Sequence, residues 1–304
     1  MRDEIFCDSS LIPHPSSLVK RRVNGPSSLL QFLTDLYPDS SKTTLRQLLQ
    51  TSRVRVNGEV EKDAKTQLEA EDVIEIAPKD VRPDLPPGLA IIHEDDDIIV
   101  VIKANGLLTV ATERERENTA QAYLNNYLRE KGEERIHVVH RLDRETSGVL
   151  VFAKNFETRE LLKERFAAHA IDRLYVAIIE GAITPPAGTI RSHLLERKDL
   201  KMHSVDAHPD AKLAVTHYRT LATGDRYSVL EVTLETGRKN QIRAHLTEAG
   251  HPVVGDQLYG STINPLGRLG LHAKLLGFAH PRTGKKMTFT APLPKSFRSV
   301  LRQS

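Results

Sequence analysis

Residues 140–154 read His-Arg-Leu-Asp-Arg-Glu-Thr-Ser-Gly-Val-Leu-Val-Phe-Ala-Lys. One carboxylate, Asp143, stands between two arginines, just before an apolar run that is typical of a buried strand. Because side chains alternate along an extended chain, Leu142 should point away from the side that Arg141 and Asp143 share. A carboxylate placed this way at the edge of a core suits a group that stays ionised and faces an anionic substrate.

The composition describes a globular protein with a weak preference for anionic partners. The chain has 304 residues, 39% of them hydrophobic, with a formal charge of +3. A single cysteine excludes a disulfide framework and a thiolate metal site, and it fits a reducing compartment. The N-terminus lacks the apolar core of a signal peptide, and no apolar run is long enough to span a membrane. We therefore expect a cytoplasmic protein with no membrane partner.

Residues 18–77 predict a small α+β unit. The leucine spacing of residues 29–36 is helical and follows two serines that suit an N-cap, and a second helix should begin near Lys42. Alternating Arg and Val over residues 53–60 predict a half-buried strand, and the Asn-Gly pair within them predicts a hairpin turn. Short apolar strands on either side should complete a sheet.

This unit resembles the S-four-type RNA-binding domain, which is named after a small-subunit ribosomal protein. Residues 18–60 hold seven Lys and Arg against three acids. The resemblance implies that cations of the second helix and the hairpin contact RNA. The candidates are Lys42, Arg46, Arg53 and Arg55. The alternative is a generic α+β unit with a solvated charged face.

A proline-rich segment, residues 78–88, predicts a semi-rigid linker between two domains. Residues 1–17 are expected to form a poorly ordered arm. The second domain, residues 89–300, is rich in apolar strand-like runs, with helices expected near 118–130 and 156–168. We therefore predict an α+β fold with a large mixed, mostly antiparallel sheet, and not a doubly wound fold.

Four segments of the second domain, taken in order, resemble the pseudouridine synthases that modify large-subunit ribosomal RNA and some transfer RNAs. They are residues 91–108, 140–154, 173–177 and 236–260. The His-Arg-Leu-Asp-x-x-Thr-Ser-Gly motif within them is highly specific. Two positions depart from the family pattern: Ala104 stands where Pro is usual, and Asn240 where His is usual.

The resemblance implies that Asp143 is the essential acid of a uridine isomerisation. That reaction breaks the N-glycosidic bond and forms a carbon–carbon bond to the same ribose. A carboxylate suits a nucleophile that attacks the anomeric carbon or the uracil ring, and it also suits a base that removes a ribose proton to give a glycal. The residues leave these routes open. The resemblance nominates Arg243 as the charge partner that offsets the effect of burial on the pKa of Asp143.

Two further roles are implied by the resemblance. Arg141 matches an arginine that fills the space of a base flipped out of the stack, for which a planar guanidinium is suited better than an ammonium. Tyr175 matches a tyrosine that stacks on the uracil and helps to remove the proton from carbon 5. A core position is the alternative for Tyr175, and a phosphate-binding or surface position is the alternative for Arg141.

No cofactor and no metal are expected, because the reaction is an isomerisation and the histidines show no convincing ligand spacing. We therefore predict a monomeric, site-specific RNA pseudouridine synthase that acts on ribosomal or transfer RNA. The alternatives are a non-catalytic RNA-binding ribosome assembly factor and an N-glycoside hydrolase. The hydrolase needs a second acid or a metal, and Glu145 lies too close to Asp143 in sequence to flank a sugar reliably.

Overall fold

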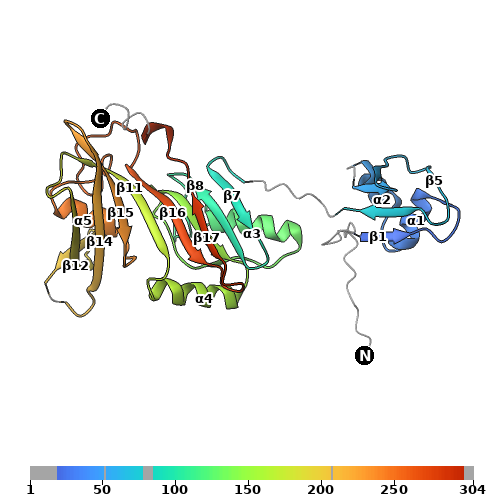
Figure 1. The fold of residues 1–304 in the computed structure, drawn as a ribbon, viewed down its shortest axis with the longest axis horizontal. Helices are drawn as coiled ribbons and strands as arrows, with labels where there is room; N and C mark the ends of the chain where they lie inside the picture. Colours follow the sequence, from blue (N-terminus) through green and yellow to red (C-terminus); the bar gives the residue numbers. More distant parts are fainter. Residues whose placement is uncertain (1–18, 51–52, 78–84, 207, 298–304) are drawn as a thin grey trace. The chain divides into compact units, whose positions relative to one another are not determined.

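The computed structural model describes residues 19–50, 53–77, 85–206 and 208–297. Contacts divide the chain into two units, Met1–Arg82 and Pro83–Ser304, which are described separately below (Figure 1). The predicted arm and most of the predicted linker lie outside the described residues. The described end of that linker belongs to the second unit, because Ala104 N donates to the carbonyl of Gly88 and Leu89 N donates to that of Pro86.

In the part of the first unit that the structure describes, there are two helices and two small sheets. Its elements are β1 (Val19–Arg22), β2 (Ser27–Ser28), α1 (Leu29–Leu36), α2 (Lys42–Gln50), β3 (Val54–Val56), β4 (Glu59–Val60), β5 (Gln67–Leu68) and β6 (Val73–Ile76). Four strands form a sheet in the order β1-β6-β3-β4, and β2 pairs with β5.

Local signals explain these elements. The Ser28 side chain accepts a hydrogen bond from Gln31 N and caps α1, as its sequence position predicts. Helix α2 buries its leucines against the sheet. The turn between β3 and β4 has positive φ at both Asn57 and Gly58, which is the requirement of a tight hairpin turn. The predicted hairpin and helices are thus confirmed.

Among its described residues, the second unit is built on one large sheet, with three named helices. Its strands are β7 (Leu89–Glu94), β8 (Ile98–Lys103), β9 (His137–Val138), β10 (Ser147–Ala153), β11 (Asp172–Glu180), β12 (Ala187–Glu196), β13 (Met202–Val205), β14 (Lys212–Thr223), β15 (Tyr227–Leu234), β16 (Leu271–Ala279) and β17 (Lys286–Thr290). Its helices are α3 (Ala120–Lys131), α4 (Phe156–Ala167) and α5 (Gln241–Glu248).

The sheet runs in the order β13-β12-β14-β15-β11-β16-β10-β8-β7, with β17 paired to β16 and β9 to β10. The β10–β16 pair is parallel and the other pairs are antiparallel. The predicted α+β class with a mixed, mostly antiparallel sheet is therefore confirmed. Helices α3 and α4 were expected close to where they lie, whereas α5 was not predicted.

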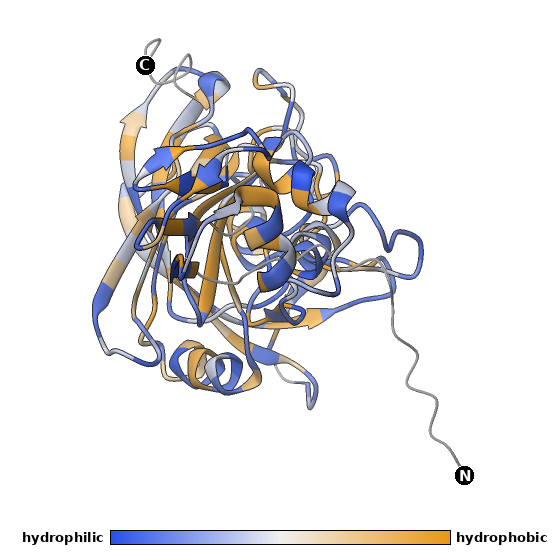
Figure 2. Ribbon diagram, turned by 90° about the vertical axis from the view of Figure 1, so that its right-hand side faces the viewer, coloured by the Kyte–Doolittle hydropathy of each residue, from blue (hydrophilic) through white to orange (hydrophobic). Residues whose placement is uncertain are grey.

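Hydrophobic stretches, orange in Figure 2, recur along the strands of this sheet, and many of the connecting loops are hydrophilic. Strand β10 is buried along its whole length. Helix α4 packs on β10, and α5 packs on β13 and β14. Among the described residues, the helices are too short or too polar to cross a bilayer.

Gly148 brings β10 close to β16 at the start of their parallel pairing. Its φ is 129°, and a Cβ atom there would lie 2.1 Å from the carbonyl oxygen of Ala273. Only glycine fits this position, which explains the Gly that ends the sequence motif. The segment that carries Asp143 enters the sheet at this point.

Candidate active site

The backbone around Asp143 is held in place on the N-terminal side by one buried hydroxyl. Thr109 Oγ1 donates to the carbonyl of Leu142 at 2.7 Å and accepts from Leu142 N at 3.2 Å. Leu142 is itself buried, while Arg141 and Asp143 both line a pocket. Leu142 lines the same pocket, so the predicted alternation along this segment is seen only in burial: Arg141 is exposed, whereas Leu142 is buried.

On the C-terminal side, the backbone is fixed by a turn that runs from Lys103 to Gly106. The buried Lys103 ammonium donates to the carbonyls of Ala104, Leu107 and Arg144 at 2.9, 2.7 and 3.1 Å. Gly106 N also donates to the Arg144 carbonyl, and Arg144 Nε donates back to the carbonyl of Gly106. Lys103 and Arg144 therefore fix the turn that presents the acid.

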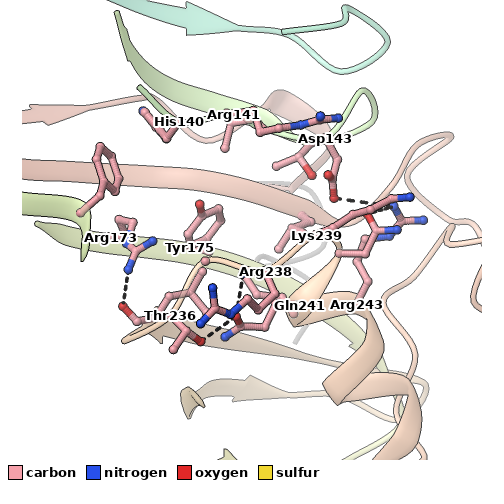
Figure 3. A pocket seen from close by; sticks show the side chains of 18 of the residues that line it. His140, Arg141, Asp143, Arg173, Tyr175, Thr236, Arg238, Lys239, Gln241 and Arg243 are labelled. Carbon is pink, nitrogen blue, oxygen red and sulfur yellow. Dashed lines mark hydrogen bonds and ion pairs between the residues drawn. The ribbon is translucent and has the colours of Figure 1, made fainter. Parts of the chain in front are cut away.

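A pocket of about 630 Å³ opens over the centre of the sheet (Figure 3). Its lining brings together Arg141 and Asp143 from the segment before β10, Tyr175 from β11 and Arg243 from α5. These residues are up to 102 positions apart in the sequence. The fold thus gathers in one cavity all the residues for which the sequence analysis predicted a role in the second domain.

Burial raises the pKa of Asp143 above its ordinary value, although Arg243, Arg141, Lys103 and Lys239 act in the opposite direction. The carboxyl side chain is 24% exposed and lies 3.8 Å from Arg243, measured between Oδ2 and Nη1. At that distance, the two side chains form an ion pair but no hydrogen bond. Asp143 is therefore a carboxylate of increased basicity whose oxygens remain free to meet a substrate.

Arg243 binds a second carboxylate more closely than it binds Asp143. Its Nε and Nη2 donate to Asp256 Oδ2 and Oδ1 at 2.6 and 2.7 Å, a bidentate pair that is buried on both sides. Its Nη1 donates to Asn240 Oδ1 at 3.1 Å. The sequence analysis did not nominate Asp256. Its one signal was a place in the Gly-Asp-x-x-Tyr stretch that follows the Arg243 segment.

Tyr175 enters the pocket at an irregularity of the sheet. The register between β11 and β16 shifts between Leu174 and Tyr175, and such bulges redirect a side chain. Burial raises the pKa of Tyr175 to about 12, with Arg173 lowering it and Asp143 raising it. The phenol is therefore neutral at physiological pH, with its hydroxyl directed toward the segment of His140 and Arg141 (Figure 3).

The rear wall of the pocket is made by an uncharged histidine. His140 Nε2 accepts a hydrogen bond from Val151 N at 3.1 Å, and its ring lies 4.7 Å from that of Phe166. Burial, reinforced by Arg173, lowers the pKa of His140 to about 3. His140, the first residue of the motif, thus accepts a backbone hydrogen bond from β10 that a neighbouring strand could otherwise accept. Its flat, uncharged ring forms part of the pocket wall.

The start of α5 is set by Gln241. Its Oε1 accepts from Thr236 Oγ1 and Arg238 N, and its Nε2 donates to the Val215 carbonyl and to Thr216 Oγ1. The side chain therefore ties the loop after β15 to β14. This tie determines where Arg243, two residues later, meets the pocket.

The cations proposed for the first unit are not equivalent. Lys42, Arg46 and Arg55 are exposed, with Lys42 and Arg46 one turn apart on α2. Arg53 is only 8% exposed, and its Nε donates to the carbonyl of Ala77. The expectation that Arg53 contacts RNA is therefore corrected: the residue precedes β3 and closes its end.

One cluster of acids and histidine lies away from the pocket. Asp95, Asp97 and His280 bring their ligand atoms within 4.8 Å of one another among the described residues. Both Asp97 oxygens are already held by Arg282, at 2.7 and 2.6 Å, and His280 Nδ1 accepts from Thr283 N. These bonds indicate that the cluster is an internal network of ion pairs and hydrogen bonds.

Each of the two units matches a known protein family. The family described as RNA pseudouridylate synthase matches residues 97–248, and the family described as S4 domain matches residues 28–74. An uncharacterized RNA pseudouridine synthase of Aquifex aeolicus is 34% identical over 94% of this chain and 96% of its own length.

Named relatives and a solved structure agree. Ribosomal large subunit pseudouridine synthase D of Pasteurella multocida is 34% identical over 88% of each chain, and that of Pseudomonas aeruginosa is 34% identical over 92% of this chain and 93% of its own. The solved structure of human RNA pseudouridylate synthase domain containing 4 aligns with a TM-score of 0.60 and 25% identity, over 70% of this chain and 92% of that chain.

Proposed function

The chain belongs to the RNA pseudouridine synthase family of isomerases and carries an N-terminal S4 domain, and we propose that it converts specific uridines of large-subunit ribosomal RNA into pseudouridine. The choice of RNA is supported by relatives named for the large ribosomal subunit. Transfer RNA is the second candidate substrate.

The observation that carries the proposal is the state of Asp143. Its side chain is half-buried, its pKa is raised, and its backbone is fixed by Thr109 at the edge of the pocket. Its ion pair with Arg243 is too long for a hydrogen bond, so both carboxylate oxygens can still contact a substrate. A carboxylate that is more basic than usual is a better nucleophile and a better base. Both properties suit attack on a uridine, and neither is needed for binding RNA.

In the proposed reaction, the bond between N1 and the anomeric carbon breaks and its electron pair leaves with the uracil. Asp143 acts on the ribose or the ring, by covalent attack or by removal of a ribose proton. The uracil then turns within the pocket, and carbon 5 bonds to the anomeric carbon. The proton lost from carbon 5 is balanced by one gained at N1, so no other reactant is consumed.

Tyr175 is proposed to support one face of the uracil as a neutral phenol. A pKa of about 12 makes it a poor base at neutral pH, so stacking is its main contribution. His140 and Phe166 offer an apolar wall beside it. Together they exclude water from the ribosyl intermediate, which favours isomerisation over hydrolysis.

Arg141 and the S4 domain are proposed to handle the RNA. Arg141 is exposed at the pocket rim, next to the segment of the acid, where a guanidinium can replace a flipped base. Lys42, Arg46 and Arg55 are exposed cations suited to phosphate contacts that carry no sequence information.

Pseudouridine mapping across total RNA, with and without the gene, tests this proposal. We expect a small number of large-subunit sites to lose pseudouridine without the gene and to regain it with the wild-type gene. Loss confined to transfer RNA would reassign the substrate. An unchanged map would indicate a non-catalytic role in ribosome assembly and contradict the proposal.

A further inference from the structure

Arg243 lies between two carboxylates and binds one of them more closely than the other. Its bidentate pair with Asp256 has N–O distances of 2.6 and 2.7 Å, whereas Asp143 lies 3.8 Å from Nη1. Asp256 is 2% exposed and Arg243 is 7% exposed, so solvent screens this cluster little. A buried guanidinium flanked by two acids carries one positive charge against two negative charges.

The guanidinium is also fixed in orientation. Asn240 Oδ1 accepts from Nη1 at 3.1 Å, and the guanidinium carbon lies 5.0 Å from the centre of the Tyr259 ring. Asp256 in turn accepts from Tyr259 N at 3.1 Å, which ties the acid to the same loop. The side chain is held by these contacts in the plane that turns Nη1 toward Asp143.

We propose that Asp256 is a positioning residue of the isomerisation: it aims Arg243 at Asp143 and offsets the guanidinium charge, so that Asp143 stays basic and free to react. This inference rests on the proposed role of Asp143. Without Asp256, Arg243 would be free to close on Asp143 as a bidentate pair. Such a pair would lower the basicity of the acid and occupy the oxygens that must reach the substrate.

The charges around Asp143 agree with this account. The cations that face it are Arg243, Arg141, Lys103 and Lys239. A carboxylate with so many cations near it would ordinarily have a depressed pKa, yet burial prevails here and the pKa is raised. Among these groups, burial lowers the pKa of Lys103 to about 7, so its charge also changes near neutral pH, while the Tyr175 phenol is neutral. Burial is the main cause of the raised pKa, and the negative charge of Asp256 beside Arg243 acts in the same direction.

Two nearly isosteric substitutions with opposite expected effects test the proposal. Asp256→Asn removes the offsetting charge, so the acid limb of the rate–pH profile should move to lower pH by about one unit, with a lower plateau. Asn240→Asp adds a negative charge beside Nη1, so the acid limb should move to higher pH. The measurement is the single-turnover rate of pseudouridine formation on the mapped RNA, across a pH series.

Asp97→Asn is the matched control, because Asp97 is also a buried acid held by a bidentate arginine, but it lies outside the pocket. It should lower stability without moving the acid limb. A purely structural Asp256 would behave in the same way, and an unmoved limb in both Asp256→Asn and Asn240→Asp would overturn the proposal.

Carboxyl carbon NMR of selectively labelled aspartates gives a second measurement that needs no turnover. The Asp143 resonance, assigned by its loss in Asp143→Asn, should titrate at lower pH in Asp256→Asn and at higher pH in Asn240→Asp. If either variant does not fold, the other still decides the sign. A wild-type protein that forms no pseudouridine would instead refute the proposed function, and that outcome is read separately from these shifts.

Discussion

Thr109 satisfies both backbone polar groups of Leu142 with one buried hydroxyl, and Leu142 is the residue before the proposed reacting acid. Thr109→Val keeps the volume but leaves a buried N–H and a buried carbonyl without partners. We expect a loss of about 1–3 kcal/mol in the free energy of unfolding, measured in urea. The single-turnover rate should fall about tenfold or more, because Asp143 loses its fixed position.

Thr109→Ser is the control for this prediction, since it keeps the hydroxyl and removes a methyl group. It should retain most of the rate. Equal losses in the two variants would indicate that the packing of the Thr109 methyl, and not its hydrogen bonds, holds the segment.

Gly148 should tolerate no side chain. A Cβ atom would lie 2.1 Å from the Ala273 carbonyl oxygen, which is backbone and cannot move aside cheaply. Gly148→Ala is expected to cost about 3 kcal/mol or more in thermal unfolding, because the β10–β16 pairing must open. Gly284→Ala has a positive φ of 69° but open space around it, and should cost only about 1–2 kcal/mol. Similar losses at both positions would contradict the close approach.

The lowered pKa of Asp97 predicts that the folded protein loses stability in acid. The hydrogen bonds of Arg282, acting against burial, lower the pKa of Asp97 to about 2 from its ordinary 3.8. A carboxyl whose folded pKa is depressed stabilises the protein above its unfolded pKa, and that stability is lost as the pH falls through the folded pKa. Because the Arg282 side chain is exposed and solvent screens the pair, we expect Asp97 to account for only about 1–2 kcal/mol between about pH 4 and pH 2.

Urea unfolding across that pH window measures this contribution. Arg282→Met should flatten the fall in the free energy of unfolding relative to wild type. An equally steep fall in the variant would show that other carboxyl groups are responsible.

Three exposed cations of the S4 domain, on α2 and the β3–β4 hairpin, should set the salt dependence of RNA binding. Replacing Lys42, Arg46 and Arg55 together by Gln removes up to three phosphate contacts. The slope of log affinity against log salt should become shallower by about 2–3, while the rate with bound RNA stays close to wild type. Lys62→Gln with Lys65→Gln changes exposed cations elsewhere in the same unit and is the control. A control that weakens binding as much would contradict a specific RNA-facing surface.

Local patterns predicted the parts of the fold that depend on neighbours in the sequence. The Asn57-Gly58 turn and the leucine face of α2 are examples, because turn chemistry and helical spacing are written within a few residues. Arg53 shows the limit of this reasoning. Its alternation with valine placed it with Arg55 on a solvated face, but the strand begins only at Val54 and Arg53 turns inward.

The sequence predicted the site residues that belong to a recognisable motif. It did not predict those whose role depends only on contacts formed in the folded protein. Asp143, Tyr175 and Arg243 were found by resemblance, and the structure places them in one pocket. Asp256 could not be predicted as the partner of Arg243, because the bend of the chain after α5 brings them together. Thr109 was missed for the same reason, since its partner Leu142 is 33 residues away.

The central claim is that Asp143 performs the chemistry, and the most direct measurement is tritium release from carbon-5-labelled uridine in the target RNA. Asp143→Asn should abolish release, by about a thousandfold or more, because the amide is neither a nucleophile nor a base. RNA affinity should change little, since the substitution keeps shape and the phosphate contacts lie elsewhere. Release at the wild-type rate by a folded Asp143→Asn protein would contradict the account.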